Sequence, residues 1–303
     1  MAGLLDCIRR ARRPAWHTLT MAQARQAYEA AAEVLEPPRR ALPEVHDLSL
    51  PAADGSLLRA RLYRGTAGIT PVLLYLHGGG FVIGSLETHD SLCRQLAHRS
   101  GAAVLALDYR LAPEHRFPTA ADDAWAALRW LVAEGGSLGL EVRRPAVGGD
   151  SAGGTLAAVC ALRARDAGLP LALQLLITPG TAARTDSTSH RMFGHGFLLD
   201  AATIAWFFDH YIAPPARHDW RFAPLEAPDV DGVAPACVIL AECDPVVDEG
   251  LAYAGRLRAA GVPVQLALYR GLTHDFIKMG RALHEAGEAQ QAAADALKEA
   301  WSS

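Results

Sequence analysis

RRPAVGGDSAGGTLAAVCAL, residues 143–162, joins a short apolar run to an alanine-rich segment through a turn that is rich in glycine. The apolar run predicts a buried strand, and the alanine-rich segment predicts a helix. Between them lies the pattern G-x-S-x-G, formed by Gly149, Asp150, Ser151, Ala152 and Gly153. The pattern is typical of a reactive serine on a sharp strand-to-helix turn, where neighbouring side chains would clash. Alone it is weak, because a plain serine in the first turn of a helix also satisfies it.

Short apolar runs alternate with helix-like segments on both sides of this stretch. The runs are PVLLYLH (71–77), AAVLALDY (102–109), LALQLLIT (171–178), ACVILAE (236–242) and VPVQLALY (262–269). Unbroken runs of this length indicate strands that are buried on both faces, as in a parallel sheet covered by helices. The sequence therefore predicts an α/β fold with a mostly parallel central sheet flanked by helices. Because no internal repeat or low-complexity linker divides the chain, residues 1–303 are expected to form a single domain.

Other segments depart from the strand-helix alternation. Apolar and polar residues alternate over 58–63 after a turn at Asp54-Gly55, which predicts antiparallel strands at a sheet edge. Thr20 is expected to cap a helix over 21–34, and Thr119 with Asp122 predicts a capping box for a helix that reaches residue 134. Residues 180–217 contain a helical stretch over 200–211 but no apolar strand. We expect about 1–45 and about 180–217 to form a helical cap over the strand ends.

A second glycine-rich motif, His77-Gly78-Gly79-Gly80, directly follows the first of these apolar runs. Such a turn exposes backbone N–H groups, which are the donors that a tetrahedral oxyanion needs. A nucleophile elbow needs such a loop directly after a neighbouring strand, and this motif lies directly after one. We expect His77 itself to be structural, with a ring that hydrogen-bonds the loop and does not titrate.

A reactive serine needs a base and a carboxylate that orients the base. Asp244 follows the run ACVILAE, and His274 follows the run VPVQLALY after a short loop. Asp248 and Glu249 compete with Asp244, but acidic residues at these positions suit the first turn of the next helix. The order Ser151, Asp244, His274 predicts a triad. If His274 is the base, activity should rise with pH through the usual imidazole range, about 6 to 7.

Five segments together resemble the hormone-sensitive-lipase family of bacterial carboxylesterases, which has the α/β-hydrolase fold. They are HGGGF (77–81), DYRLAPEH (108–115), GDSAGG (149–154), DPVVDEG (244–250) and Thr273-His274. The resemblance implies that the N–H groups of Gly79, Gly80 and Ala152 form an oxyanion hole. It also implies that Gly78 shapes the turn and that residues 110–117 are architectural.

Three positions depart from the family pattern. Val246-Val247 replaces the usual Leu-Arg, Cys243 stands where an aromatic residue is common, and residues 178–180 read Thr-Pro-Gly in place of a Tyr-Pro strand end. These departures leave the shape of the substrate pockets open, whereas the triad is complete.

The sequence predicts a serine carboxylesterase that hydrolyses short-to-medium acyl esters of small molecules through an acyl-enzyme, without a metal or another cofactor. A small-molecule receptor on the same fold is an alternative, but by the same resemblance such receptors lose the histidine that is present here as His274. An amidase or peptidase is a second alternative. His190 and His195 lie in the insertion, where a surface or supporting role is favoured over a place in the substrate cleft. No cluster of histidine, cysteine or acidic residues shows metal-ligand spacing.

Composition excludes other classes of protein. The net charge is −4, from 29 basic and 33 acidic residues, so nucleic acid is not an expected partner. Neither a membrane span nor a signal peptide is evident, and the five scattered cysteines suit a cytoplasmic protein whose thiols are mostly in the core. The basic residues Arg9, Arg10, Arg12 and Arg13 are expected to be a solvated terminus, because a stable membrane anchor needs a second signal. An unpaired sheet edge is compatible with a homodimer.

Overall fold

The computed structural model describes residues 1–12 and 14–302, so Arg13 lies outside the described residues. Its centre is an eight-stranded sheet with the order β1-β2-β4-β3-β5-β6-β7-β8. The strands are β1 (Glu44–Pro51), β2 (Leu57–Arg64), β3 (Thr70–Leu76), β4 (Ala103–Asp108), β5 (Leu140–Asp150), β6 (Gln174–Ile177), β7 (Ala236–Cys243) and β8 (Val264–Thr273). Strands β3 to β8 are mutually parallel, whereas β1 and β2 join one edge in antiparallel pairs. The expected mostly parallel sheet and its antiparallel edge are confirmed.

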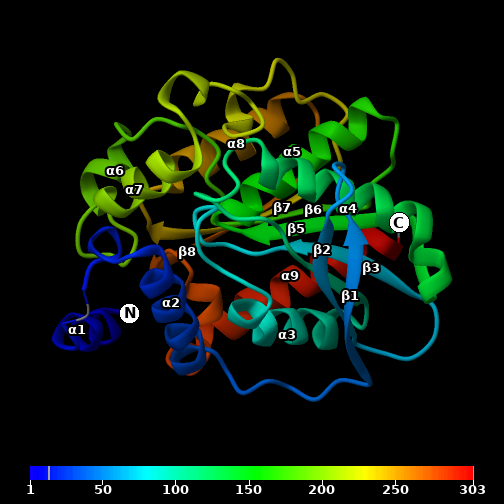
Figure 1. Ribbon diagram of the computed structural model, residues 1–303, viewed down its shortest axis with the longest axis horizontal. Helices are drawn as coiled ribbons and strands as arrows, with labels where there is room; N and C mark the ends of the chain where they lie inside the picture. Colours follow the sequence, from blue (N-terminus) through cyan, green and yellow to red (C-terminus); the bar gives the residue numbers. More distant parts are fainter. Residues whose placement is uncertain (13, 303) are drawn as a thin grey trace.

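Two helical layers cover the sheet (Figure 1). On one face lie α4 (Thr119–Glu134), α5 (Ala152–Asp166) and α8 (Val247–Ala259), and on the other lie α3 (Asp90–Ser100) and α9 (His284–Ser302). Alternate residues of β3 supply the two cores, because successive side chains of a strand point to opposite faces. Leu74 and Leu76 belong to the core under α4 and α5, whereas Leu73 and Tyr75 belong to the core under α3 and α9.

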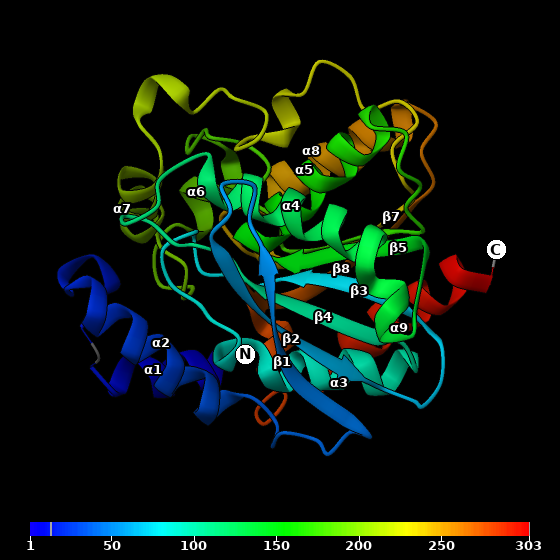
Figure 2. The same ribbon diagram turned by 45° about the vertical axis from the view of Figure 1, so that its right-hand side comes forward.

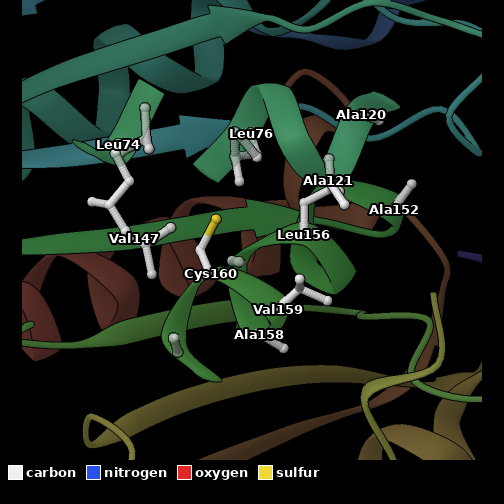
Figure 3. Close-up of a cluster of buried hydrophobic side chains, with 14 of the residues drawn as sticks. Leu74, Leu76, Ala120, Ala121, Val147, Ala152, Leu156, Ala158, Val159 and Cys160 are labelled. Atoms are coloured by element: carbon white, nitrogen blue, oxygen red, sulfur yellow. The ribbon is translucent and has the colours of Figure 1, made fainter. Parts of the chain in front are cut away.

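The core beneath α4 and α5 is built from small and branched side chains (Figure 3). Leu74 and Leu76 of β3 and Val147 of β5 meet Leu156 and Cys160 of α5. All five are fully buried. Burying a leucine of this kind is worth about 1.5–3 kcal/mol relative to leaving it exposed. This packing fixes α5 against the C-terminal half of β5 and so fixes the turn between them.

The two segments outside the alternation lie together at the edge where the parallel strands end (Figure 2). The first contains α1 (Ala2–Arg10), η1 (Trp16–Thr18) and α2 (Met21–Leu35), and the second contains α6 (Thr188–Phe193), α7 (Ala201–Tyr211) and η4 (Pro214–Ala216). The helices expected over 21–34 and 200–211 are confirmed, and η1 contacts α7. Thr20 caps α2 as expected, because its hydroxyl accepts from the N–H of Gln23 and the Gln23 side chain accepts from the N–H of Thr20.

Two local predictions are wrong. The capping box at Thr119 does not form, since α4 has Pro118 at its N-cap without a side-chain hydrogen bond, and Asp122 instead binds Arg163 at 3.0 Å. Tyr63, which the alternation places on the polar side of β2, is buried because α3 covers that face. Its hydroxyl donates to Asp90 at 2.9 Å.

Within the described part of the chain, no helix has the length and apolar character that a bilayer span requires. All five cysteines are free thiols, and Cys93, Cys160 and Cys237 are buried, as expected of core residues.

Candidate active site

Ser151 lies at the sharp turn between β5 and α5. Its backbone has φ 53° and ψ −121°, a region that costs energy for any residue with a side chain and that clusters at functional sites. The turn packs two glycines so closely against the end of β3 that a Cβ at Gly149 or Gly153 would overlap the carbonyl oxygen of Leu76. The N–H of Ser151 donates to the carbonyl of Ile177 on β6 at 2.8 Å. The sheet therefore holds the serine hydroxyl at the end of β5.

His274 and Asp244 meet Ser151 at this edge. Nε2 of His274 lies 2.8 Å from Oγ of Ser151, and Nδ1 of His274 lies 2.7 Å from Oδ2 of Asp244. The other carboxylate oxygen of Asp244 accepts from the N–H of Val246 at 3.0 Å. The structure thus brings together the three residues that the sequence singles out, in the order hydroxyl, imidazole, carboxylate.

The acidic residues that compete with Asp244 have other hydrogen-bond partners. Asp248 and Glu249 are in the first turn of α8, where Asp248 accepts from the N–H of Ser189 at 2.9 Å and Glu249 accepts from the N–H of Thr181 at 2.8 Å. Burial raises the pKa of Glu249 to about 8, although the backbone N–H groups of Thr181 and Ala182 act in the opposite direction. His274 makes its carboxylate hydrogen bond with Asp244 instead.

The electrostatic surroundings of His274 favour its protonated form. Burial disfavours the charged ring, but the charge of Asp244 and its hydrogen bond outweigh burial. Asp275 and Asp150 add to this effect, and the pKa of His274 is raised to about 9. The site is therefore arranged to stabilise an imidazolium once His274 accepts a proton.

The glycine-rich loop after β3 faces the turn that carries Ser151. Gly79 has φ 122°, a conformation that favours glycine, and a Cβ at Gly80 would overlap the ring of Phe207. Ala152 is the first residue of α5, so its N–H has no acceptor within the helix. The backbone at these three positions suits the donor role that the family resemblance implies.

Asp150, the residue before the serine, anchors this loop. Its Oδ1 accepts from the N–H of Gly78 at 3.2 Å and from the hydroxyl of Tyr75 at 2.6 Å, and its Oδ2 lies 3.1 Å from Nε2 of His89. Burial opposes the carboxylate, but His89, Lys278 and Tyr75 outweigh burial and lower the pKa of Asp150. Asp150 therefore ties the serine turn to the loop as a charged, fully buried residue.

His77 is placed as a structural residue. Its Nδ1 lies 2.9 Å from the carbonyl oxygen of Gly78, and its ring stacks on Tyr109 with centroids 4.2 Å apart. Burial, together with the nearby His89, lowers the pKa of His77 to about 3. The ring is therefore neutral at any pH near 7, in agreement with a histidine that does not titrate.

A cavity of about 60 Å³ lies beside Ser151. Its walls are Gly80, Phe81, Ser151, Ala152, Thr155, Gly180, Ala182, His190, Leu199, Ile204, Phe207, Phe208, Phe222, Val246 and Glu249. His190 thus lines the cavity and is buried, so the expectation of a surface or supporting role over a place in the substrate cleft is wrong for it, whereas His195 is exposed as expected. Most walls are apolar, and Ile204, Phe207 and Phe208 come from α7. Helix α7, from the segment expected to form part of the cap, therefore forms one side of the cavity.

Sequence patterns do not reveal every residue of the site. His89, in η2 (Glu87–His89), and Phe207, on α7, come from segments with no motif around them. The one sequence feature that could have pointed to His89 is its position shortly after the glycine-rich loop, and this feature is not specific. The segment 110–117 is braced as expected, because Arg110 forms an ion pair with the buried Asp123 at 2.6 Å. Over residues 1–12 and 14–302, no group of three or more histidine, cysteine or acidic residues is placed to hold a metal ion.

Comparison with known proteins identifies the family of this chain. A family model described as alpha/beta hydrolase fold matches residues 73–278. Ethyl acetate hydrolase from Pseudomonas putida is 44% identical over 291 residues, which are 93% of this chain and 91% of that protein. Carboxylesterase NlhH from Mycobacterium tuberculosis is 41% identical over 241 residues, 76% of this chain and 74% of that protein.

Solved structures agree with these relatives. An alpha/beta hydrolase enzyme from the metagenome of Lake Arreo, Spain, superposes with a TM-score of 0.94 at 40% identity and covers 99% of this chain and 96% of its own. The hyperthermophilic esterase from Pyrobaculum calidifontis gives a TM-score of 0.92 at 36% identity, with 98% and 96% covered. The chain therefore belongs to the hormone-sensitive-lipase family of α/β hydrolases and is a carboxylic ester hydrolase.

Proposed function

We propose that the chain hydrolyses esters through a covalent acyl-enzyme with Ser151 as the nucleophile. As Oγ of Ser151 attacks the ester carbonyl carbon, its proton passes to Nε2 of His274. The tetrahedral intermediate collapses when the C–O bond to the alcohol breaks and His274 returns the proton to the leaving oxygen. A water molecule then attacks the acyl-serine by the same proton transfers, which releases the acid and restores Ser151.

The observation that carries this proposal is the continuous hydrogen-bond chain from Ser151 through His274 to Asp244, with distances of 2.8 and 2.7 Å. Asp244 holds the imidazole with Nδ1 protonated, so that Nε2 is free to accept from the serine. The loop at Gly79 and Gly80 and the start of α5 at Ala152 supply N–H groups for the oxyanion.

We propose short-to-medium acyl esters of small molecules, with about four to eight acyl carbons, as the substrates. A cavity of about 60 Å³ beside Ser151, with walls that are mostly apolar, supports a limited acyl group. The relative that is named ethyl acetate hydrolase also supports a preference for small esters. A cytoplasmic location and a homodimer through an unpaired sheet edge stay predictions.

Replacement of the nucleophile tests the mechanism. Ser151→Ala should lower kcat by about 10⁴-fold or more, and His274→Ala should be nearly as damaging, because the members of a triad act as a unit. A phosphonate ester should label the wild-type protein once, at Ser151, as mass spectrometry of the digested protein would show. Ser137→Ala, at an exposed serine of η3 (Gly135–Leu138), is the matched control and should keep full activity. A loss of only a few-fold in Ser151→Ala, or an adduct elsewhere, would overturn the proposal.

A further inference from the structure

Asp275, the residue after His274, places a second carboxylate beside the imidazole. Its backbone is left-handed, with φ 60° and ψ 10°, a conformation that aspartate tolerates better than most residues. Its Oδ1 lies 3.9 Å from Nε2 of His274, beyond hydrogen-bond distance, and this oxygen is buried without a hydrogen-bond partner among the described residues. The carboxylate therefore acts on the ring through its charge.

A hydrogen-bond chain from elsewhere in the fold holds Asp275. The ammonium of Lys278 donates to the hydroxyl of Tyr28 at 3.0 Å, and that hydroxyl donates to Oδ2 of Asp275 at 3.3 Å. The direction of the chain follows from chemistry, because an ammonium has donors only. The phenol oxygen must accept from Lys278, so its single O–H is left for Asp275.

Tyr28 belongs to the N-terminal segment, and Lys278 belongs to η6 (Phe276–Lys278), on the loop that carries His274. Figure 1 shows α2 beside the stretch of chain that follows β8 and contains η6. Trp16 packs edge-on against the ring of Tyr28, with centroids 5.9 Å apart, which fixes the phenol. The N–H of Arg281 donates to the carbonyl of Leu35 at 3.1 Å, so backbone contacts also join the two segments.

Lys278 is an unusual residue to find in this place, because its side chain is only 6% exposed. Its ammonium lies 3.6 Å from Oε1 of the equally buried Glu36 and 4.6 Å from the centroid of the Tyr28 ring. Burial opposes the charge, but Tyr28, Glu36 and Asp275 outweigh burial and raise the pKa of Lys278. Lys278 therefore carries its charge at neutral pH and orients the phenol.

Several charged or titratable groups act on this part of the site. Those that face His274 or Asp275 are Asp244 after β7, Asp150 at the end of β5, Glu249 on α8, Tyr28 on α2, and Lys278 on η6. Glu36 contacts Lys278, and His89 contacts Asp150. Of these, Asp244 makes the hydrogen bond to Nδ1, and Asp275 is the carboxylate beside Nε2.

We propose that Asp275 is a positioning residue that stabilises the imidazolium form of His274 from the Nε2 side, and that Tyr28 and Lys278 hold its carboxylate there. This inference rests on the proposed function, since it assigns the role of base to His274. When Ser151 transfers its proton to Nε2, the positive charge forms next to Asp275 as well as next to Asp244. The N-terminal segment thus contributes to the chemistry of a loop that is almost 250 residues away in the chain.

The pH dependence of kcat/KM tests the role of Asp275. Asp275→Asn removes the negative charge with little change in shape, so the protonated imidazole is less stabilised and the pKa of His274 falls. The acid limb of the profile, which is the range where kcat/KM rises with pH, should therefore move to lower pH by about one unit. The plateau rate should fall by up to about tenfold, since one pKa unit corresponds to a tenfold weaker stabilisation of the imidazolium. A merely structural role would lower the rate without moving the limb. An unmoved limb would overturn the proposal.

Tyr28→Phe tests the hydrogen-bond chain. Without the phenol, Asp275 is no longer held against the ring and is free to turn toward solvent, so the limb should move in the same direction as in Asp275→Asn, but less. In the double variant, Tyr28→Phe should add no further shift, because the group it acts through is gone. Additive shifts would show that Tyr28 acts independently, and would overturn its part in the proposal.

Controls separate this inference from the mechanism on which it depends. Tyr253→Phe removes another buried hydroxyl, one without a hydrogen-bond partner in the part of the chain that the structure describes, and should leave the limb in place. Phosphonate labelling of Ser151 is measured in every variant. Normal labelling with an unmoved limb in Asp275→Asn would defeat the role of Asp275 alone. Failure of the wild-type protein to be labelled at Ser151 would instead defeat the proposed function.

Discussion

At the scale of single residues, the raised pKa of His274 has a direct kinetic consequence. The base must be neutral to accept a proton, so kcat/KM should fall tenfold for each pH unit below the pKa of His274 in the free enzyme. Because Asp244 and its neighbours raise this pKa to about 9, we expect the acid limb to lie above 7, higher than an imidazole in water would predict. A pH profile of kcat/KM for a neutral ester, whose own ionisation cannot interfere, measures the limb.

Asp244→Asn is the matched variant for this prediction. This substitution removes the charge that chiefly raises the pKa of His274 against the effect of burial. The acid limb of any residual activity should therefore lie at lower pH, while kcat falls by about 10⁴-fold. A wild-type limb within or below the ordinary imidazole range, about 6 to 7, would contradict a histidine base with a raised pKa.

At the scale of elements, α7 decides how far the cavity beside Ser151 extends. Phe207 lies against the backbone of Gly80, so its ring closes the cavity next to the loop that is expected to bind the oxyanion. Phe207→Ala should raise the ratio of kcat/KM for eight-carbon over two-carbon acyl esters by at least tenfold, because each methylene newly accommodated in an apolar pocket is worth about 10-fold or more. Competition assays with p-nitrophenyl esters of graded length measure the ratio.

Phe193→Ala is the control, since Phe193 lies on α6 and packs on Phe197, with ring centroids 5.2 Å apart, away from the cavity walls. It should leave the chain-length preference unchanged. An identical preference in Phe207→Ala and the wild-type protein would show that α7 does not limit the acyl group.

Two helix starts with similar sequence patterns should respond differently to the same substitution. Thr20→Ala removes the side-chain acceptor at the N-cap of α2 and should lower the free energy of unfolding by about 1 kcal/mol. Thr119→Ala removes no cap, because the hydroxyl of Thr119 makes none at the start of α4. Urea unfolding followed by circular dichroism compares them. A larger loss in Thr119→Ala than in Thr20→Ala would contradict the assignment of the two caps.

At the scale of the whole molecule, the N-terminal segment and the insertion both bind the segment 110–117, and η1 contacts α7. Arg25 of α2 binds Glu114 at 2.7 Å, and the N–H of Phe117 donates to the carbonyl of Tyr211 at the end of α7. We therefore expect a fixed cap rather than an opening lid. The rate on a soluble ester should not jump when its concentration passes the solubility limit, and emulsified long-chain triglyceride should be a poor substrate. A sharp increase at the interface, or a preference for sixteen-carbon acyl chains, would mean that the cap opens.

Several features of the site could be predicted because they depend on local backbone geometry. The turn at Ser151 needs glycines on both sides, and the loop at Gly79 needs a left-handed conformation, so both leave a mark in the sequence. Asp244 and His274 could be singled out because each follows a buried strand, and parallel strands end at one edge. Asp275 and Lys278 could not, since their partners Tyr28 and Glu36 come from an unrelated stretch of chain.

The sequence by itself determined the sheet, the serine turn and the order of the catalytic candidates, because each of these depends on residues that are close together in the chain. The tertiary structure alone decided which side chains close the cavity and which charges surround His274. Phe207, His190 and Tyr28 owe their places to the packing of two helical segments onto the strand ends. Such contacts join residues that are far apart in sequence, and many side chains of similar size and polarity could make them, so no local pattern encodes them.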